Sequence, residues 1–372
     1  MQKLGAIVML GSGGASPQEQ LVLTAQRAAT IDLIYALNHL NINPIILCSQ
    51  EFSWWAEDIP VWLAPDPVNR TFHFGEHLAE TIIASQLDHV VYFGGASAPL
   101  LDQQMLGLLL DLLRQSSTKR TLICNNLHSS DWVGLTNVKD ALPIIKAAER
   151  DNGLAWALRE EGRYHVRVLP EIRQAAAMDI DTPTDLAILR QHAESGPALR
   201  QALNTPLLDS IPIQAVLDTI ARPGSRLALV GRVSPRAWDA VSHATQCWIR
   251  VFSEERGMIA SGRATENGVR SLLGVLLDLQ GPQAFFETLG SIVDAAIIDS
   301  RVLFAHQGLQ PSAADRFASD LFWVNAIEEP WIREFTAAAA AAPIPILLGG
   351  HSAVGGGLHV MSEILAARAT PN

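Results

Sequence analysis

Three carboxylates gather in one short stretch of the chain, AAAMDIDTPTDLAIL, over residues 175–189. Asp179, Asp181 and Asp185 flank a Thr-Pro turn at the mouth of an apolar helix. Carboxylate oxygens are the ligands that Mg²⁺ prefers, so Asp179 and Asp181 could hold a metal ion beside a nucleotide. The same residues could instead only start a helix, with Asp181 or Thr182 as the cap and Asp185 near the positive end of the helix dipole. Both interpretations stay open at this point.

A glycine-rich loop, LGSGGAS, follows the first apolar run of the chain. Glycines let the backbone come close to a ligand, and the amides that precede a helix can bind phosphate. The loop therefore predicts a nucleotide-binding segment made of Gly11, Ser12, Gly13 and Gly14.

The second half of the chain carries a separate set of polar residues at the ends of apolar runs. One run ends at AAIIDSRVLFAH, another breaks at LLGGHSAVGGG, and a charged loop, SEERGMIASGRA, follows a third. Loops at strand ends are where α/β proteins form their sites. We expect a candidate pocket from Asp299, Arg301, His306, Gly350, His351, Ser352, Arg256 and Arg263. The alternatives are a solvated loop for the arginines of the charged loop, a plain turn at the glycines and a surface ion pair between Arg316 and Asp320, four residues apart.

These residues need a scaffold, and the hydrophobic pattern predicts one. In the first half, strand-like runs such as GAIVML and HVVYF alternate with amphipathic helices, which indicates an α/β fold with a mostly parallel, Rossmann-like sheet flanked by helices. The second half reads as a further, helix-rich α/β domain, with helices over 266–280 and 282–292. A proline-bearing segment near residue 200 separates them, so we expect domains at 1–198 and 199–372.

Composition narrows the possible partners. The chain has 372 residues, 48% of them apolar, and a formal net charge of −11. Nucleic acid and anionic membranes need a basic surface, so neither is expected as a partner, and no run approaches the ~20 apolar residues of a membrane helix. Three well-separated cysteines favour reduced thiols and a cytoplasmic location. The apolar N-terminal run is read as a first strand and not as a signal peptide.

The segment MDIDTPTDL resembles the closing motif of the nucleotidyltransferase-like family with the GT-A fold. That family includes molybdenum-cofactor guanylyl- and cytidylyltransferases, phospholactate guanylyltransferase and some small glycosyltransferases. The order of elements is similar too: a strand with a glycine loop, a helix and second strand at AATIDLIYALNHLNINPIILCS, and VVYFGG before an apolar PLL helix start. The resemblance covers about residues 4–195.

The resemblance implies transfer of a nucleoside monophosphate from a nucleoside triphosphate to a small phosphorylated acceptor, with Mg²⁺ as cofactor at Asp179 and Asp181. A nucleotide or small phosphorylated molecule would then be the partner. Two features depart from the family pattern: Ala96 or Ser97 stands where an aspartate is expected, and the glycine loop meets no basic residue until Arg27. Elsewhere in the first half, Glu76 and Asp102 are carboxylates that could substitute for the missing acid.

Two other functions remain open from the sequence. The first half could be a degenerate nucleotidyltransferase fold that serves as a scaffold or ligand-binding module, with any functional site in the second half. It could also be a small glycosyltransferase, which would require the same aspartate that is missing at Ala96 or Ser97.

Overall fold

The computed structural model describes residues 2–116, 119–167, 173–259 and 261–369. These residues form two compact units that are interleaved in sequence. The first unit comprises Met1–Ser12, Gln26–Asp179 and Gly196–Leu199, and the second comprises Gly13–Ala25, Ile180–Ser195 and Arg200–Asn372.

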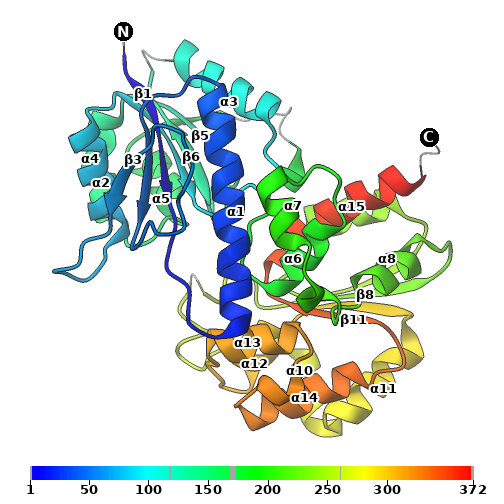
Figure 1. Cartoon of the computed structure of the whole chain (residues 1–372). Helices are drawn as coiled ribbons and strands as arrows, with labels where there is room; N and C mark the ends of the chain where they lie inside the picture. The colour runs from blue at the N-terminus through cyan, green and yellow to red at the C-terminus, as the bar shows by residue number, and fades with distance from the viewer. Residues whose placement is uncertain (1, 117–118, 168–172, 260, 370–372) are drawn as a thin grey trace. The chain divides into compact units, whose positions relative to one another are not determined.

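The first unit is built on a seven-stranded sheet in the order β3-β2-β1-β4-β6-β5-β7. Figure 1 labels β1, β3, β5 and β6 of this sheet. Every strand pairing is parallel except those of β6, which runs antiparallel to β4 and β5. The strands are β1 (Leu4–Met9), β2 (Ile45–Ser49), β3 (Trp62–Pro65), β4 (His89–Gly94), β5 (Thr121–Cys124), β6 (Trp132–Leu135) and β7 (His165–Val166). The helices are α1 (Pro17–His39), α2 (Phe74–Ser85), α3 (Gln103–Gln115), α4 (Val138–Ala147) and α5 (Leu154–Glu160), with a 3-10 helix over Gln174–Ala177.

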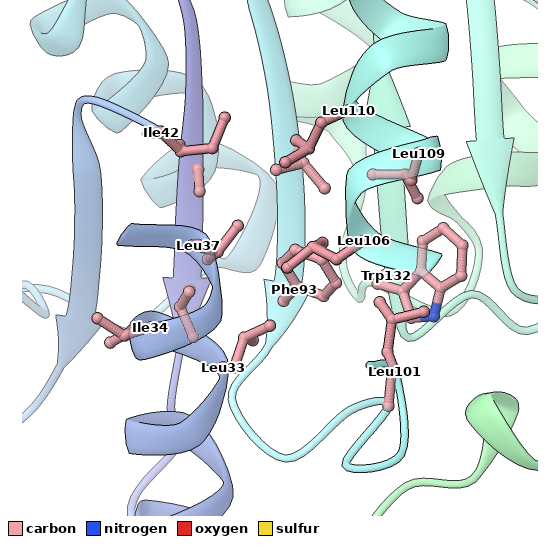
Figure 2. Close-up of a cluster of buried hydrophobic side chains, with 14 of the residues drawn as sticks. Leu33, Ile34, Leu37, Ile42, Phe93, Leu101, Leu106, Leu109, Leu110 and Trp132 are labelled. Carbon is pink, nitrogen blue, oxygen red and sulfur yellow. The ribbon is translucent and has the colours of Figure 1, made fainter. Parts of the chain in front are cut away.

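Helices cover both faces of this sheet, because its central strands are apolar on both faces. On one face α1 and α3 pack on β1, β2 and β4 through a leucine-rich cluster that includes Leu37, Leu106 and Phe93 (Figure 2). On the other face α2, α4 and α5 pack through a cluster that includes Leu78 and Ile145. The predicted α/β class with a mostly parallel sheet is therefore confirmed.

The second unit contains a four-stranded sheet in the order β11-β10-β8-β9, in which every pairing is parallel. Its strands are β8 (Arg226–Gly231), β9 (Trp248–Ser253), β10 (Ala295–Asp299) and β11 (Ile346–Gly349). Its helices are α6 (Pro183–Arg190), α8 (Ile213–Ala221), α9 (Pro235–Ala244), α10 (Leu272–Gln280), α11 (Pro282–Ile292), α12 (Ser300–His306), α13 (Ala313–Asp320), α14 (Pro330–Ala340) and α15 (Gly356–Ala369). Helix α7 (Pro197–Leu203) and 3-10 turns at Pro206–Leu208, Val324–Ala326 and Ser352–Val354 complete the path.

One face of this second sheet is covered by α10, α11, α12 and α14, through a phenylalanine-rich core that includes Phe285, Phe304 and Phe335. Helix α15 packs against α6, α8 and α9, and both α6 and α8 contact β11. The second unit is thus a helix-rich α/β layer structure, as the sequence predicts.

Three boundaries differ from the sequence-based expectations. Helix α1 begins at Pro17, well before the run AATIDLIYALNHL in which the sequence predicts a helix. The helix expected over 266–280 begins only at Leu272, because the Ser271 hydroxyl accepts the Gly274 amide and caps it there. The division by contacts also differs from the expected junction at 198, because α6 packs against β11 and α15 and so belongs with the second unit.

No helix in the described part of the chain is long and apolar enough to cross a membrane. The three cysteines, Cys48, Cys124 and Cys247, are free thiols.

Gly231 ends β8 and packs closely against Asp299 at the end of β10. Its φ is +107°, and a β-carbon there would lie 2.5 Å from Cβ of Asp299. We expect Gly231→Ala to lower the free energy of unfolding by about 3 kcal/mol, from backbone strain and overlap together. Gly257→Ala is the matched control: its φ is +78° but the space around it is open, so about 1 kcal/mol is expected. Equal losses in urea unfolding would contradict this account.

Candidate functional site

Strands β1 and β4 are neighbours at the centre of the first sheet, where the strand order reverses. Open α/β sheets bind ligands in the crevice at such a point, beyond the carboxyl ends of the strands. Here the two loops are joined directly: the Gly95 amide donates to the Met9 carbonyl at 2.7 Å, and the Thr30 hydroxyl donates to the Gly95 carbonyl. One backbone and one side-chain hydrogen bond, both neutral, therefore join the loops at this point.

Ser97 lies at the position where the family resemblance implies an acid. It pairs with Asp179 in an isolated antiparallel bridge, so the closing motif and the β4 loop do meet in the first unit. The Ser97 hydroxyl donates to the Gly94 carbonyl at 2.8 Å. A neutral hydroxyl that is already engaged is a weak substitute for a carboxylate ligand. Asp179 belongs to the first unit and Asp181 to the second.

The glycine loop is also divided, with Gly11 and Ser12 in the first unit and Gly13 and Gly14 in the second. The Glu19 carboxylate turns back onto the loop and accepts the Ser16 amide at 3.2 Å and the Ser16 hydroxyl at 2.7 Å. A β-carbon at Gly14 would collide with this carboxylate. The loop therefore faces a negative charge of its own chain, which opposes a phosphate at that place.

The two carboxylates considered as substitutes have structural partners. Asp102 caps α3 by accepting the Met105 amide at 2.8 Å, and Glu76 in the first turn of α2 lies 3.5 Å from Arg70. Among the described residues no group of three or more His, Cys, Asp or Glu side chains is arranged to hold a metal ion.

Sequence reasoning missed one polar group at the carboxyl end of β4. Asp151 lies beside Gly94, where a β-carbon would come within 3.7 Å of its Oδ2, and it accepts the Tyr92 hydroxyl at 3.2 Å. Burial raises the pKa of Asp151. Asp131 is also close, because its carbonyl accepts the Gly94 amide at 2.9 Å. Both aspartates lie in loops next to β6 and α5, which the hydrophobic pattern did not reveal.

The helix-start interpretation of DIDTPTDL is confirmed. Thr182 is the cap of α6, Pro183 opens the helix, and Asp185 follows in its first turn. Oδ2 of Asp185 accepts the backbone amides of Asp181 at 3.0 Å and Thr182 at 2.7 Å, and the Thr182 hydroxyl at 2.9 Å. This is the acidic half of a capping box.

Asp185 has a second role that the sequence did not indicate. It is fully buried, and the Ser352 hydroxyl donates to its two oxygens at 2.7 and 2.8 Å. The carboxylate thus ties the start of α6 to the glycine-rich loop that follows β11. Burial, and then the charge of Asp181, raises the pKa of Asp185 to about 7.

In the second sheet the strand order reverses between β8 and β10, and a buried ion pair lies at their carboxyl ends. Arg232, directly after β8, donates to the Asp299 carboxylate through Nε at 2.6 Å and Nη2 at 3.1 Å. Asp299 has no exposed surface. Burial opposes its ionisation, but the charge of Arg232, helped by His351 and Arg301, outweighs burial and lowers the pKa of Asp299.

A second buried ion pair adjoins the first. Arg301, at the start of α12, donates to both oxygens of Asp320 at 2.6 Å, and Asp320 is also fully buried. The surface pair expected between Arg316 and Asp320 is therefore wrong, because Asp320 is taken by an arginine nineteen positions away in the chain. Burial opposes the charge of Arg301, but Asp320 outweighs it and raises the pKa of the guanidinium.

Two arginines near these pairs donate no side-chain hydrogen bond to a described residue: Arg316 on α13, which the charges of Asp320, Asp181 and Glu19 reach only at longer range, and Arg256 in the loop after β9. Nε of Arg316 is withdrawn from water without an acceptor, and burial followed by the charge of Arg301 lowers the pKa of Arg316. Arg256 is exposed and within electrostatic reach of His351. Desolvation of the His351 ring lowers its pKa, and the charges of Arg232 and Arg256 lower it further.

The structure thus brings together most, but not all, of the residues expected in the second half. Asp299, Arg301, Gly350, His351, Ser352 and Arg256 lie at or near the carboxyl ends of β8, β10 and β11. His306 lies elsewhere, buried between the Ser271 amide at 3.1 Å and Asp278 at 3.0 Å. Arg263 is engaged by Glu255 at 2.8 Å. Arg232 and Arg316 were not anticipated as members.

Chemically, this group can bind an anion. Its buried carboxylates are each matched by an arginine, and two further guanidiniums are left without an acceptor among the described residues. We refer to Arg232, Arg256, Asp299, Arg301, Arg316, Asp320 and His351 as the arginine cluster.

Arg301 and Arg316 differ in whether their loss would leave a buried carboxylate without its cation. Arg301→Gln leaves Asp320 buried without its cation, so we expect a loss of about 3–5 kcal/mol in the free energy of unfolding. Arg316→Gln removes a charge that has no acceptor, so stability should stay the same or rise. Urea unfolding of both variants measures the contrast, and a large loss in Arg316→Gln would show that this side chain has a structural partner.

Asp185 predicts a pH dependence of stability. Its folded pKa of about 7 exceeds the usual unfolded value near 4, so the folded state holds more protons between these values and loses stability as pH rises through them. Asp185→Asn is nearly isosteric, since its oxygen can replace Oδ2 and its amide can donate to Ser352. Between pH 5 and pH 8 we expect the free energy of unfolding of the parent chain to fall by about 2–3 kcal/mol relative to that of the variant. Thermal unfolding of both chains at several pH values measures this difference. Parallel pH profiles would contradict the raised pKa.

No family model matches this chain, and no curated protein matches it. Solved structures do. A cytidylyltransferase from Leptospira borgpetersenii is 14% identical, with 51% of this chain and 86% of that chain covered at a TM-score of 0.38. The 2-C-methyl-D-erythritol 4-phosphate cytidylyltransferase from Thermus thermophilus is 13% identical, with 53% and 98% covered at a TM-score of 0.36.

A manganese complex of the Rv0371C protein from Mycobacterium tuberculosis is also similar, at 16% identity, with 55% of this chain and 100% of that chain covered and a TM-score of 0.32. At identities and TM-scores of this size, these likenesses carry no argument about what this chain binds or catalyses.

Proposed function

We propose that this chain binds a small anionic molecule, bearing a phosphoryl or carboxylate group, at the arginine cluster of its second unit. In this proposal the first unit has a nucleotidyltransferase-like fold and serves as a scaffold. The observation that carries the proposal is the state of Arg316: a guanidinium partly withdrawn from water, with no acceptor for its buried Nε among the described residues.

A buried guanidinium donor without an acceptor lowers the stability of the folded chain. A buried donor without an acceptor costs about 1–3 kcal/mol, and more when it is charged. An anionic ligand would supply the missing acceptor, and arginine is suited to bidentate binding of phosphate and carboxylate. Asp299 and Asp320 do not repel that ligand strongly, because Arg232 and Arg301 neutralise their charges.

The overall charge is the second argument. A chain with a net charge of −11 repels anions except where cations are concentrated. The carboxyl ends of β8 and β10 form the reversal point of the second sheet, where α/β proteins bind ligands, and arginines are concentrated there.

The first unit supports catalysis less well. Metal-assisted nucleotidyl transfer needs carboxylates for the metal and cations for the triphosphate. Ser97 stands where the acid is expected, the Glu19 carboxylate faces the part of the glycine loop that belongs to the second unit, and no described group of three or more His, Cys, Asp or Glu side chains is arranged to hold a metal ion.

Calorimetry separates the two functions. The ligands are inorganic phosphate and the nucleotides GTP, CTP, ATP and UTP, each with and without Mg²⁺. We expect binding that needs no metal, is weakened at least tenfold in Arg316→Gln and in Arg256→Gln, and weakens with salt. Arg263→Gln is the matched control, because Glu255 already engages that arginine.

Three outcomes would overturn the proposal. They are the absence of a binding heat with every ligand, binding that survives both arginine substitutions, and binding that requires Mg²⁺ and disappears in Asp179→Asn. The last outcome would support metal-assisted nucleotidyl transfer in the first unit.

A further inference from the structure

Helix α13 meets the starts of two other helices within the second unit. The Gln18 side chain donates to the Ala314 carbonyl at 3.1 Å, which joins the first turn of α1 to α13, and α13 also contacts α6. Each of these helix starts carries an acid: Glu19 lies in the first turn of α1, and Asp181 directly precedes the cap of α6. The charges of both acids reach Arg316 on α13.

Neither acid forms a close ion pair with Arg316. The Arg316 side chain donates no hydrogen bond to a described residue, so Glu19 and Asp181 act on it only at longer range. Asp181 is exposed and Glu19 is half-buried, so both are accessible from the solvent. A plain anion bound to Arg316 would therefore be attracted by the guanidinium and repelled by these two carboxylates.

Glu19 also keeps an oxygen that can accept a hydrogen bond from a ligand. Its Oε2 accepts the Ser16 amide at 3.2 Å and the Ser16 hydroxyl at 2.7 Å. Its Oε1 accepts no hydrogen bond from a described residue, although each carboxylate oxygen has two lone pairs. Arg316 thus offers a donor without an acceptor, and Glu19 offers an acceptor without a donor.

A ligand with two opposite charges satisfies both of these groups. Its phosphoryl or carboxylate group supplies the acceptor for Arg316. A protonated amine on the same molecule supplies donors to Glu19 and offsets the repulsion from both carboxylates. An amine fits this place better than a divalent cation does, because no described group of three or more His, Cys, Asp or Glu side chains is arranged to hold a metal ion.

We propose that the ligand of the arginine cluster is zwitterionic, with its anionic group on Arg316 and a protonated amine, a short spacer away, against Glu19 and Asp181. This inference rests on the proposed function and adds the class of ligand to it. Small amino acids and phosphate esters of amino alcohols both have this chemistry.

Calorimetry at pH 7 with two pairs of probes tests the inference. Aminoethyl phosphate is compared with ethyl phosphate, and β-alanine with propionate. The members of each pair differ only by an amine, which is protonated at this pH. We expect the parent chain to bind the amine-bearing member of at least one pair at least tenfold more tightly, and that pair identifies the anionic group.

Three variants show which residues recognise the amine. Glu19→Gln removes the charge but keeps an oxygen for the Ser16 hydrogen bonds, so the preference for the amine should fall at least fivefold, with the plain anion bound equally well or more tightly. Asp181→Asn should lower the preference in the same direction. Glu287→Gln is the matched control, because Glu287 is exposed on α11 and is not among the charges that act on Arg316.

The results separate this inference from the proposed function. Equal affinities within both pairs would overturn the inference and leave the anion site standing, whereas no binding heat with any probe would overturn the anion site itself. A preference that survives in Glu19→Gln and in Asp181→Asn would also overturn the inference. Circular dichroism checks that each variant folds, and if one does not, the other decides.

Discussion

The second unit depends on the pairing of charges that have no access to water. Asp299 and Asp320 are completely buried, and each is held by one arginine, Arg232 or Arg301. Removing either partner of such a pair leaves an uncompensated charge in a poorly polarisable interior, which costs more than the pair itself contributes. These pairs therefore fix the start of α12 and the ends of β8 and β10, and with them the geometry of everything near the carboxyl end of the sheet.

The same constraint explains why the two units differ at equivalent points of their sheets. In the first unit a single neutral backbone hydrogen bond joins Gly95 to Met9 at the reversal point, and the neighbouring Ser97 carries no charge. In the second unit the corresponding place carries paired charges, and Arg316 in excess of them. In the proposed site, a cation without an acceptor lowers stability, which is the usual trade between stability and function.

The sequence predicted the parts of this protein that depend on local pattern. Alternating strands and helices, the cap of α6 and the glycine loop after β11 were visible because each involves residues close together in the chain. The partners of buried charges were not visible: Asp320 was expected to pair with Arg316, four residues away, but pairs with Arg301. The contact between Asp185 and Ser352 spans 167 positions, and no local rule identifies it. Strand β6 was not predicted because its four residues, WVGL, show no clear alternation.

The central claim is that the functional site lies at the carboxyl end of the second sheet. Hydrogen exchange with and without a bound phosphate-bearing ligand tests it most directly, since it locates the ligand without assuming which residue binds. We expect slower exchange in peptides that cover residues 231–236, 299–303, 313–320 and 349–356. Slower exchange confined to residues 10–16 and 94–98 would place the ligand at the glycine loop and the β4 loop, and would contradict the account.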